Sequence, residues 1–317
     1  MNIAYACNEA YMEQTVVSVL SLLQTNSKVP SIVIYFIDMG TTNESRAYLN
    51  DVVSSFGRQF IIIPFMDIAY DLKVKNTGRH IESVYAKLFF GRINGIDRIL
   101  YIDSDTVIVD DLTDYYETNL DGYYCAGVLT LIRIEDTKRI GIGETDKAFN
   151  DGVLLINLKL WRNDNVLEKC KDFIARYDGE PPVLSEGTIN NVCKERIKVV
   201  NPRYNLSSGF IDTNVKKIEA DTGRTFYSQS VLDNAVANPA IIHFLSGFYN
   251  RPWCIDCTHP MKDEYIKYRK KTKWKNQPLL NKKLPLRIKI IGFTYKYLPI
   301  WLFCFIRKVS RLFRKVL

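Results

Sequence analysis

Short apolar runs alternate with amphipathic stretches along the first third of the chain, and this alternation restricts the possible folds more than any other feature of the sequence. The runs are rich in β-branched and aromatic residues, which predicts strands at 3–7, 31–38, 59–64 and 98–102, the first of them buried. The stretches between them predict helices at 13–24, 44–56 and 83–92. Strands and helices that alternate at this spacing form a parallel sheet through crossover connections, so we expect an α/β fold with a mostly parallel sheet.

The region from 112 to 260 has a more mixed pattern. It predicts strands at 123–131 and 153–157 and a helix at about 165–177. Hydrophobic residues make up 47% of the chain and charged residues 25%. These fractions are near the average for soluble globular proteins and exclude disordered, collagen-like and polytopic membrane classes.

The fourth predicted strand ends in an acidic turn, Tyr101-Ile-Asp103-Ser-Asp105. Ligands bind beyond the carboxyl ends of the strands in parallel sheets. Two carboxylates at i and i+2 can there converge on one hard cation such as Mg²⁺ or Mn²⁺. The alternative is a solvated turn in which the aspartates cap the segment that follows. The apolar runs on both sides of the turn favour the cation site.

Four segments, in this order, resemble glycosyltransferase family 8, whose members are retaining enzymes with the GT-A fold. They are Ile3-Ala-Tyr-Ala-Cys-Asn-Glu-Ala-Tyr11, Leu100-Tyr-Ile-Asp-Ser-Asp105, Phe149-Asn-Asp-Gly-Val-Leu-Leu-Ile-Asn-Leu-Lys-Leu-Trp161, and His243-Phe-Leu-Ser-Gly247 with Arg251-Pro-Trp253. The resemblance covers roughly residues 1–260. It implies a Rossmann-like, mostly parallel sheet flanked by helices. It also implies transfer of glucose or galactose from a UDP-sugar to a cell-surface glycan or lipopolysaccharide acceptor.

The resemblance also implies roles for individual residues. Ala6, Asn8 and Tyr11 would line the uridine pocket, with Tyr11 offering its ring face to the base. Asp103, Asp105 and His243 would hold a divalent metal, Mn²⁺ or Mg²⁺, that bridges both phosphates. A histidine at the end of an apolar run can instead be a satisfied core residue. The remaining residues expected to contact the nucleotide-sugar are Lys87, Ser104, Asn150, Asp151, Gly152, Gly247 and Arg251.

Three departures from the family pattern concern the sugar more than the nucleotide. Where the family often has D-Q-D-x-x-N, this chain has Ser185-Glu-Gly-Thr-Ile-Asn190. Glu186 thus takes the position beneath the anomeric carbon, where a carboxylate could stabilise an oxocarbenium-like transition state or act as nucleophile. Thr130 falls where some galactosyltransferases have an aspartate, which favours glucose as the donor sugar. The spacing from His243 to Arg251 is two residues longer than the usual His-to-Lys spacing.

Two other functions remain as alternatives. Asp103-Ser-Asp-Thr-Val also resembles the nucleophile loop of haloacid-dehalogenase phosphatases, although that loop normally follows the first strand of its domain. The other alternative is a membrane-tethered UDP-sugar-binding subunit without catalytic activity, which the substitutions at 185–187 keep open.

The C-terminal segment has a different charge from the rest of the chain. Residues 262–317 contain 17 Lys or Arg and two acids, whereas the whole chain carries +8, so residues 1–261 carry a net charge of −7. We therefore divide the chain into a GT-A domain at 1–261 and a basic amphipathic segment at 262–317. An anionic partner is expected for that segment. Because no nucleic-acid-binding motif is present, we expect a membrane surface and no nucleic acid.

The sequence 297–306 is apolar but too short to cross a bilayer, which needs about 20 residues. Next to clustered Lys and Arg it predicts a helix lying on an anionic membrane, and the alternative is a helix packed on the body.

The N-terminus shows no secretory signal, and the seven scattered cysteines are typical of reduced thiols. We expect a peripheral protein on the cytoplasmic face of the cell membrane. Cys254 and Cys257, with His259 nearby, suggest a zinc site. Such a site needs four ligands, however, and no second ligand pair lies at a suitable spacing.

Overall fold

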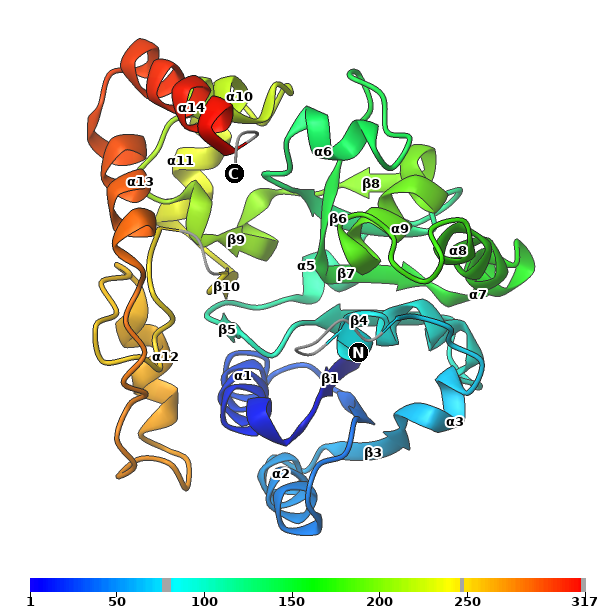
Figure 1. Ribbon diagram of the computed structural model, residues 1–317. Helices are drawn as coiled ribbons and strands as arrows, with labels where there is room; N and C mark the ends of the chain where they lie inside the picture. Colours follow the sequence, from blue (N-terminus) through cyan, green and yellow to red (C-terminus); the bar gives the residue numbers. More distant parts are fainter. Residues whose placement is uncertain (76–80, 246–247, 315–317) are drawn as a thin grey trace.

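The computed structural model describes residues 1–75, 81–245 and 248–314 of the 317-residue chain. Its centre is a seven-stranded sheet with the strand order β3-β2-β1-β4-β7-β6-β8 (Figure 1). The strands are β1 (Asn2–Cys7), β2 (Val33–Asp38), β3 (Gln59–Pro64), β4 (Arg98–Ile102), β6 (Cys125–Leu129), β7 (Phe149–Asn157) and β8 (Ile197–Val199). Only β7 runs antiparallel to its neighbours, β4 and β6, among these described strands. The expected mostly parallel α/β fold is confirmed.

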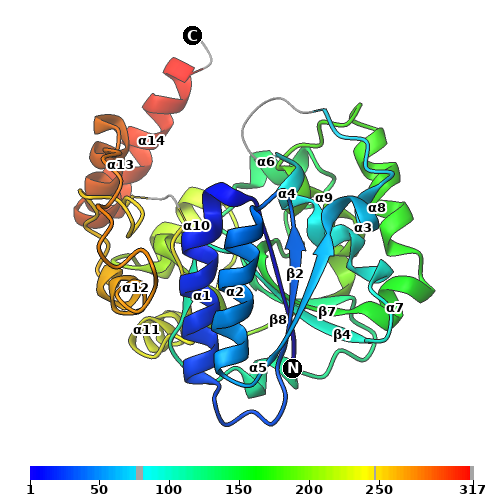
Figure 2. The ribbon, with the colours of Figure 1, turned by 90° about the horizontal axis from the view of Figure 1, so that it is seen from below.

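Helices cover both faces of this sheet (Figure 2). On one face lie α1 (Met12–Thr25) and α2 (Asn43–Ser55), whose apolar residues form one buried cluster with the strands. The other face is covered by α3 (Phe65–Ala69), the 3₁₀ helix η2 (Ala86–Arg92), α7 (Leu158–Asn163), α8 (Val166–Ala175) and α9 (Leu184–Cys193). The sheet therefore contributes to two hydrophobic cores, as a doubly covered α/β sheet requires.

A second, three-stranded sheet has the order β5-β10-β9. Its strands are β5 (Thr106–Ile108), β9 (Leu206–Ser207) and β10 (Ile241–His243). β10 runs antiparallel to β5, and this register places His243 opposite Thr106. The small sheet thus brings the end of β10 next to the acidic turn that follows β4.

The remaining short elements connect these layers. They are α4 (Ile81–Val84), α5 (Thr113–Tyr116), α6 (Ile134–Lys138), α10 (Val215–Thr222), α11 (Gln229–Ala237), and the 3₁₀ helices η1 (Glu9–Tyr11), η3 (Lys194–Arg196), η4 (Pro202–Asn205) and η5 (Ser208–Phe210). The stretch 83–92 is helical as expected but divided, because α4 ends at Val84 and a 3₁₀ helix follows from Ala86.

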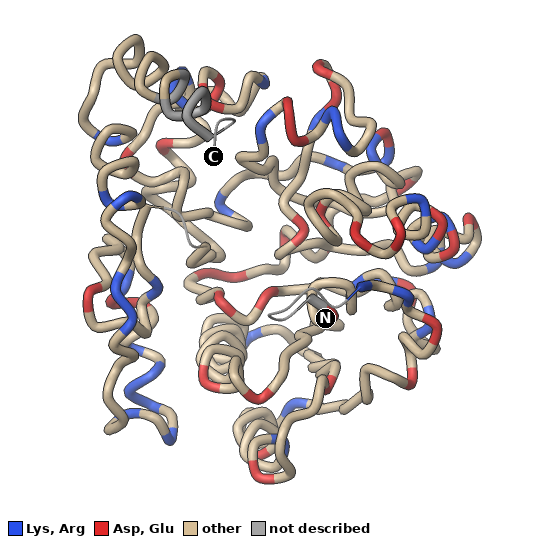
Figure 3. Tube along the Cα trace, viewed as in Figure 1, with Lys and Arg blue, Asp and Glu red and all other residues tan. Residues whose placement is uncertain are grey.

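Three helices follow the body: α12 (Lys262–Arg269), α13 (Leu286–Tyr297) and α14 (Ile300–Arg314). Lys and Arg recur along this segment, which runs down one side of the molecule (Figure 3). α12 packs on α1, where Arg269 Nε donates to Glu13 Oε1 at 2.7 Å and Tyr265 OH donates to the same oxygen at 3.0 Å. The division of the chain at residue 261 stays a prediction. Among the described helices, none is long and apolar enough to cross a membrane.

Candidate functional site

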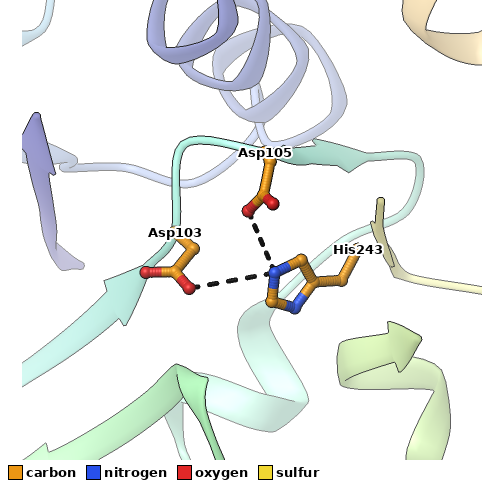
Figure 4. Close-up of side chains that lie close together, drawn as sticks. All are labelled: Asp103, Asp105 and His243. Carbon is orange, nitrogen blue, oxygen red and sulfur yellow. Dashed lines mark hydrogen bonds and ion pairs between the residues drawn. The ribbon is translucent and has the colours of Figure 1, made fainter. Parts of the chain in front are cut away.

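Asp103, Asp105 and His243 converge at the carboxyl end of β4 (Figure 4). Nε2 of His243 lies 3.0 Å from Asp105 Oδ1 and 3.8 Å from Asp103 Oδ2. One ligand atom from each residue lies within 4.8 Å of the others. Two carboxylate oxygens and an imidazole nitrogen are a donor set that fits Mn²⁺ or Mg²⁺.

Backbone pairing fixes this turn. The N–H of Asp103 donates to Gly152 O at 2.7 Å, and the N–H of Phe244 donates to Asp105 O at 2.9 Å. Gly152 is required by this packing, because a Cβ there would lie 2.5 Å from both Asp103 Oδ2 and His243 Cε1.

The two carboxylates differ electrostatically. Burial raises the pKa of Asp103, and the charge of Asp105 adds to the rise while Lys87 opposes it. Burial would also raise the pKa of Asp105, but His243 and Arg251 together hold that pKa well below its usual range. Asp105 is therefore the permanently charged member of the pair.

A cavity of about 260 Å³ opens beside the two aspartates, and the predicted uridine and diphosphate residues line it. Asn8 caps η1 by accepting from the N–H of Ala10 at 3.2 Å. Burial raises the pKa of the Tyr11 hydroxyl. The residues of the expected set that line the cavity are Ala6, Asn8, Tyr11, Asp103, Ser104, Asp105 and Arg251.

Ser104 and Arg251 are each held by a neighbour. Ser104 is buried and accepts from the Thr15 hydroxyl at 2.8 Å. The guanidinium of Arg251 is ion-paired with Asp105 Oδ2. The unusual spacing between His243 and Arg251 therefore still leaves the cation beside the acidic turn.

Glu186, in the first turn of α9, is a buried carboxyl group. Its Oε2 accepts from Asn150 Nδ2 at 2.9 Å, and its Oε1 accepts from the Thr130 hydroxyl at 3.2 Å. Burial, with the charge of Asp151, raises the pKa of Glu186 to about 8. The group is therefore largely protonated at neutral pH.

Lys87 and Asp151 are not among the residues that line this cavity. Lys87 Nζ lies 3.0 Å from Asp151 Oδ2, and the Lys87 side chain is only 2% exposed. Ser185 donates to the same carboxylate oxygen at 2.5 Å. Their predicted contacts with the sugar stay predictions. Gly247 lies outside the described residues.

Cys257 and His259, near the C-terminal end of the body, form hydrogen bonds with other protein groups. Cys257 donates to Asn250 O at 3.1 Å, and both ring nitrogens of His259 are hydrogen-bonded, Nε2 to Ser208 at 3.1 Å and Nδ1 to the Met261 N–H at 3.1 Å. None of the seven cysteines is in a disulfide.

Sequence reasoning missed three residues of the site. Tyr101 donates to Asp103 Oδ1 at 2.5 Å, and Asn205 Oδ1 lies 2.8 Å from His243 Nδ1. Leu245 lines the cavity described above. Tyr101 could have been found, because it lies two residues before Asp103. Asn205 belongs to no motif, whereas Leu245 lies within the segment His243-Phe-Leu-Ser-Gly247, in which only the histidine and the glycine were given roles.

A second cavity of about 250 Å³ adjoins the first. Leu245 lines both cavities. Asn150 and Thr130, which contact Glu186, also line the second cavity, as do Phe248 and Tyr295 of α13. Both hydrogen-bond partners of the Glu186 carboxyl group therefore face the second cavity.

Comparison with known proteins gives a family match over most of the chain. The family model "Glycosyl transferase family 8" matches residues 2–257. General stress protein A of Bacillus subtilis is 26% identical over 283 residues, which cover 86% of this chain and 94% of that protein. Glycosyltransferase GlyE of Streptococcus pneumoniae is 25% identical over 79% of this chain, but the match spans only 56% of GlyE.

A solved structure shares the fold. The galactosyltransferase LgtC, solved in complex with donor and acceptor sugar analogs, superposes with a TM-score of 0.68 at 21% identity. The match covers 90% of this chain and 98% of the LgtC chain.

Proposed function

The chain belongs to glycosyl transferase family 8, and from that membership we propose that it transfers a hexose from a UDP-sugar to a cell-surface glycan or lipopolysaccharide, with retention of anomeric configuration. The observation that carries this proposal is the convergence of Asp103, Asp105 and His243 beside a cavity that also exposes Tyr11 and Arg251. We favour glucose over galactose as the donor sugar. This preference rests on Thr130, because some galactosyltransferases have an aspartate at that position. The Thr130 hydroxyl donates to Glu186.

Asp103, Asp105 and His243 would hold Mn²⁺ or Mg²⁺ through two carboxylate oxygens and Nε2. A divalent cation bound there would offset the charge that grows on the departing diphosphate. Arg251, now paired with Asp105, can donate to diphosphate oxygens and so stabilise the same charge. Tyr11 would offer a ring face to the uracil base.

We assign Glu186 a role as a neutral hydrogen-bonding acid beneath the anomeric carbon. A nucleophile must be ionised, but burial raises the pKa of Glu186 to about 8. Both of its carboxyl oxygens are also engaged, by Thr130 and Asn150. This environment supports transfer without a covalent sugar–enzyme intermediate.

The second cavity is the proposed acceptor site. An acceptor hydroxyl held there would approach the donor sugar from the side of Asn150, since Asn150 lines this cavity and Leu245 lines both. Phe248 and Tyr295 would provide apolar faces for a sugar ring.

The C-terminal helices are the proposed membrane contact. An apolar strip of large side chains that are 55–72% exposed runs along α13 and α14 at spacings of three or four residues; it consists of Leu286, Ile290, Phe293, Tyr297, Trp301 and Phe305. Arg287, Lys289 and Lys296 belong to the same helix as the first four. Apolar side chains beside cations suit an anionic membrane surface, and we propose the cytoplasmic face of the cell membrane.

Turnover of UDP-sugars tests the proposal directly. We would measure UDP release from UDP-glucose and UDP-galactose with Mn²⁺ or with EDTA, for the wild type and for Asp103→Asn/Asp105→Asn. We expect Mn²⁺-dependent release that falls by about a hundredfold or more in the double variant. Asp114→Asn, an exposed acid in α5, is the matched control and should keep full activity.

The alternatives give different results in the same assay. UDP binding without turnover by the wild type would favour the non-catalytic binding subunit. Absence of both turnover and UDP binding would overturn the proposal. Phosphatase activity is no longer a candidate, because the family match spans 2–257 rather than the acidic loop alone.

A further inference from the structure

The hydrogen bonds around His243 give a role to a residue that no motif indicated. We propose that Asn205 is a positioning residue of the metal centre. It holds His243 in the tautomer whose Nε2 lone pair faces Asp103 and Asp105, and it links that imidazole to the amide of Asn150.

One backbone group sets the direction of the whole network. The N–H of Gly152 lies 3.2 Å from a side-chain atom of Asn150, and because an N–H only donates, that atom is the oxygen Oδ1. The Asn150 amide Nδ2 then donates to Glu186 at 2.9 Å. The same Oδ1 lies 2.8 Å from Asn205, so the Asn205 atom at that contact is its Nδ2 amide.

Asn205 consequently turns its oxygen toward His243. Asn205 Oδ1 lies 2.8 Å from His243 Nδ1, and because an amide oxygen only accepts, Nδ1 carries the proton. A neutral imidazole with a proton on Nδ1 has a lone pair on Nε2. That nitrogen is the one 3.0 Å from Asp105. A lone pair directed at carboxylates is an arrangement that a cation completes.

Burial and strand pairing hold Asn205 in this place. His243 is 0% exposed and Asn205 is 1% exposed. Asn205 ends η4 directly before β9, and β9 pairs with β10 in parallel with Ser207 opposite His243. Asn205 therefore lies two residues before the position opposite His243, and its side chain reaches the imidazole ring.

The result is a continuous path from a metal ligand to the group beneath the proposed reaction centre. It runs from His243 through Asn205 and Asn150 to Glu186. The inference rests on the proposed function for its metal and for its Glu186 end, whereas the tautomer of His243 is a property of the protein alone.

Imidazole nitrogen NMR on the full chain tests the tautomer. The sequence contains three histidines, so His243→Gln identifies the relevant signals. In the metal-free wild type we expect the neutral form, observed at the alkaline end of a titration, to carry its proton on Nδ1. Asn205→Ala should populate the Nε2–H form, because Asp105 is then the remaining acceptor. Asn205→Asp should keep the Nδ1–H form, since a carboxylate still accepts.

Mn²⁺ affinity, measured by calorimetry in the presence of UDP, provides the second readout. Asn205→Ala should weaken binding about tenfold or more, which is typical for loss of a group that orients a ligand. Asn205→Asp should bind Mn²⁺ at least as well as the wild type but lose turnover, because it cannot donate to Asn150. Asn238→Ala, an exposed asparagine at the end of α11, should change neither.

Several outcomes would overturn the proposal. They are an Nε2–H tautomer in the wild type, or an Asn205→Ala variant with unchanged tautomer and Mn²⁺ affinity. If Asn205→Ala fails to fold, the His243 tautomer in the wild type and in the nearly isosteric Asn205→Asp still tests the proposal. A wild type that turns over no UDP-sugar would refute the proposed function, but the tautomer would still be measured.

Discussion

Glu186 enters the first turn of α9 with both carboxyl oxygens hydrogen-bonded, to Asn150 and Thr130. Burial and the nearby Asp151 charge favour its protonated form. A protonated carboxyl group has one donor and one acceptor end, as a glutamine amide does. At neutral pH the Glu186 carboxyl group therefore offers the same hydrogen-bonding groups as the glutamine that the family often has at this position. It becomes negatively charged only as the pH approaches 8.

Glu186→Gln should stabilise the protein, and the gain should grow with pH. The pKa of Glu186 is raised from 4.5 to about 8 on folding. Between these values the unfolded chain releases a proton that the folded chain keeps, so wild-type stability falls as pH rises, by on the order of 1 kcal/mol per pH unit. Glu186→Gln has no ionisable group at this position, so its stability lacks this fall with pH.

Urea unfolding at several pH values from 5 to 8 measures the difference between the two proteins. Glu195→Gln, an exposed glutamate in η3, is the control. Parallel pH curves for wild type and Glu186→Gln would contradict the assignment. Loss of all transfer activity in Glu186→Gln would instead indicate a nucleophile.

The sequence predicted individual site residues only where a motif carried them. Asp103, Asp105 and Arg251 were expected and lie on one cavity. Asn205 was not expected, because its position depends on strand register in the small sheet, and a two-residue strand such as β9 leaves no recognisable pattern.

At the scale of elements, three segments meet around one buried charge. Lys87 of η2 pairs with Asp151 of β7, and Ser185 of α9 donates to the same carboxylate. In the family pattern D-Q-D-x-x-N an acid stands where this chain has Ser185, and here the carboxylate lies across the same contact, on Asp151. An exchange of the acid and the hydroxyl between these two positions should therefore keep a carboxylate beside Lys87.

This exchange predicts a rescue. Asp151→Ser should destabilise the protein by about 3 kcal/mol, because it leaves Lys87 buried without a counter-charge. Adding Ser185→Asp should restore most of that loss, whereas Ser185→Asp alone should destabilise by placing two carboxylates beside one lysine. Urea unfolding of the four proteins measures the coupling. A double variant no more stable than Asp151→Ser would contradict the exchange.

The elements that escaped prediction are those in which polar site residues interrupt the pattern. The strand expected at 153–157 begins four residues earlier, at Phe149, because Asn150 and Asp151 hide its apolar alternation. The 3₁₀ helix η2 buries five consecutive residues, from Ala86 to Phe90, so it has no amphipathic period to read. By contrast, β1, β2 and β4 were readable because buried parallel strands are continuously apolar.

At the scale of the whole molecule, a net negative body carries a basic edge (Figure 3). The apolar strip on α13 and α14 lies on this edge, while Tyr295 on another side of α13 packs against Phe248 and Phe303. Lys217 Nζ donates to Tyr295 O at 2.7 Å and so holds the end of α13. The helix is thus attached to the body through one face and leaves the other exposed.

Vesicle flotation tests this surface. Phe293→Ser/Trp301→Ser should lower binding to phosphatidylglycerol vesicles by roughly a hundredfold or more, since each side chain loses a favourable burial. Binding of the wild type should weaken with salt and on phosphatidylcholine. Ile255→Ser, an equally exposed apolar residue on the body, is the control. Unchanged binding by the double variant would favour the alternative in which these helices serve only to pack on the body.

The pairing of β10 with β5 has a consequence for the order of events during synthesis. Asp105 and His243 are 138 positions apart in sequence. Contacts between such distant segments form late, because a long loop must close first. A nascent chain that has emerged only as far as its acidic turn therefore has two aspartates and no third ligand. At the proposed metal site, tight chelation of a divalent ion would therefore become possible only once the segment that carries His243 has folded onto the acidic turn.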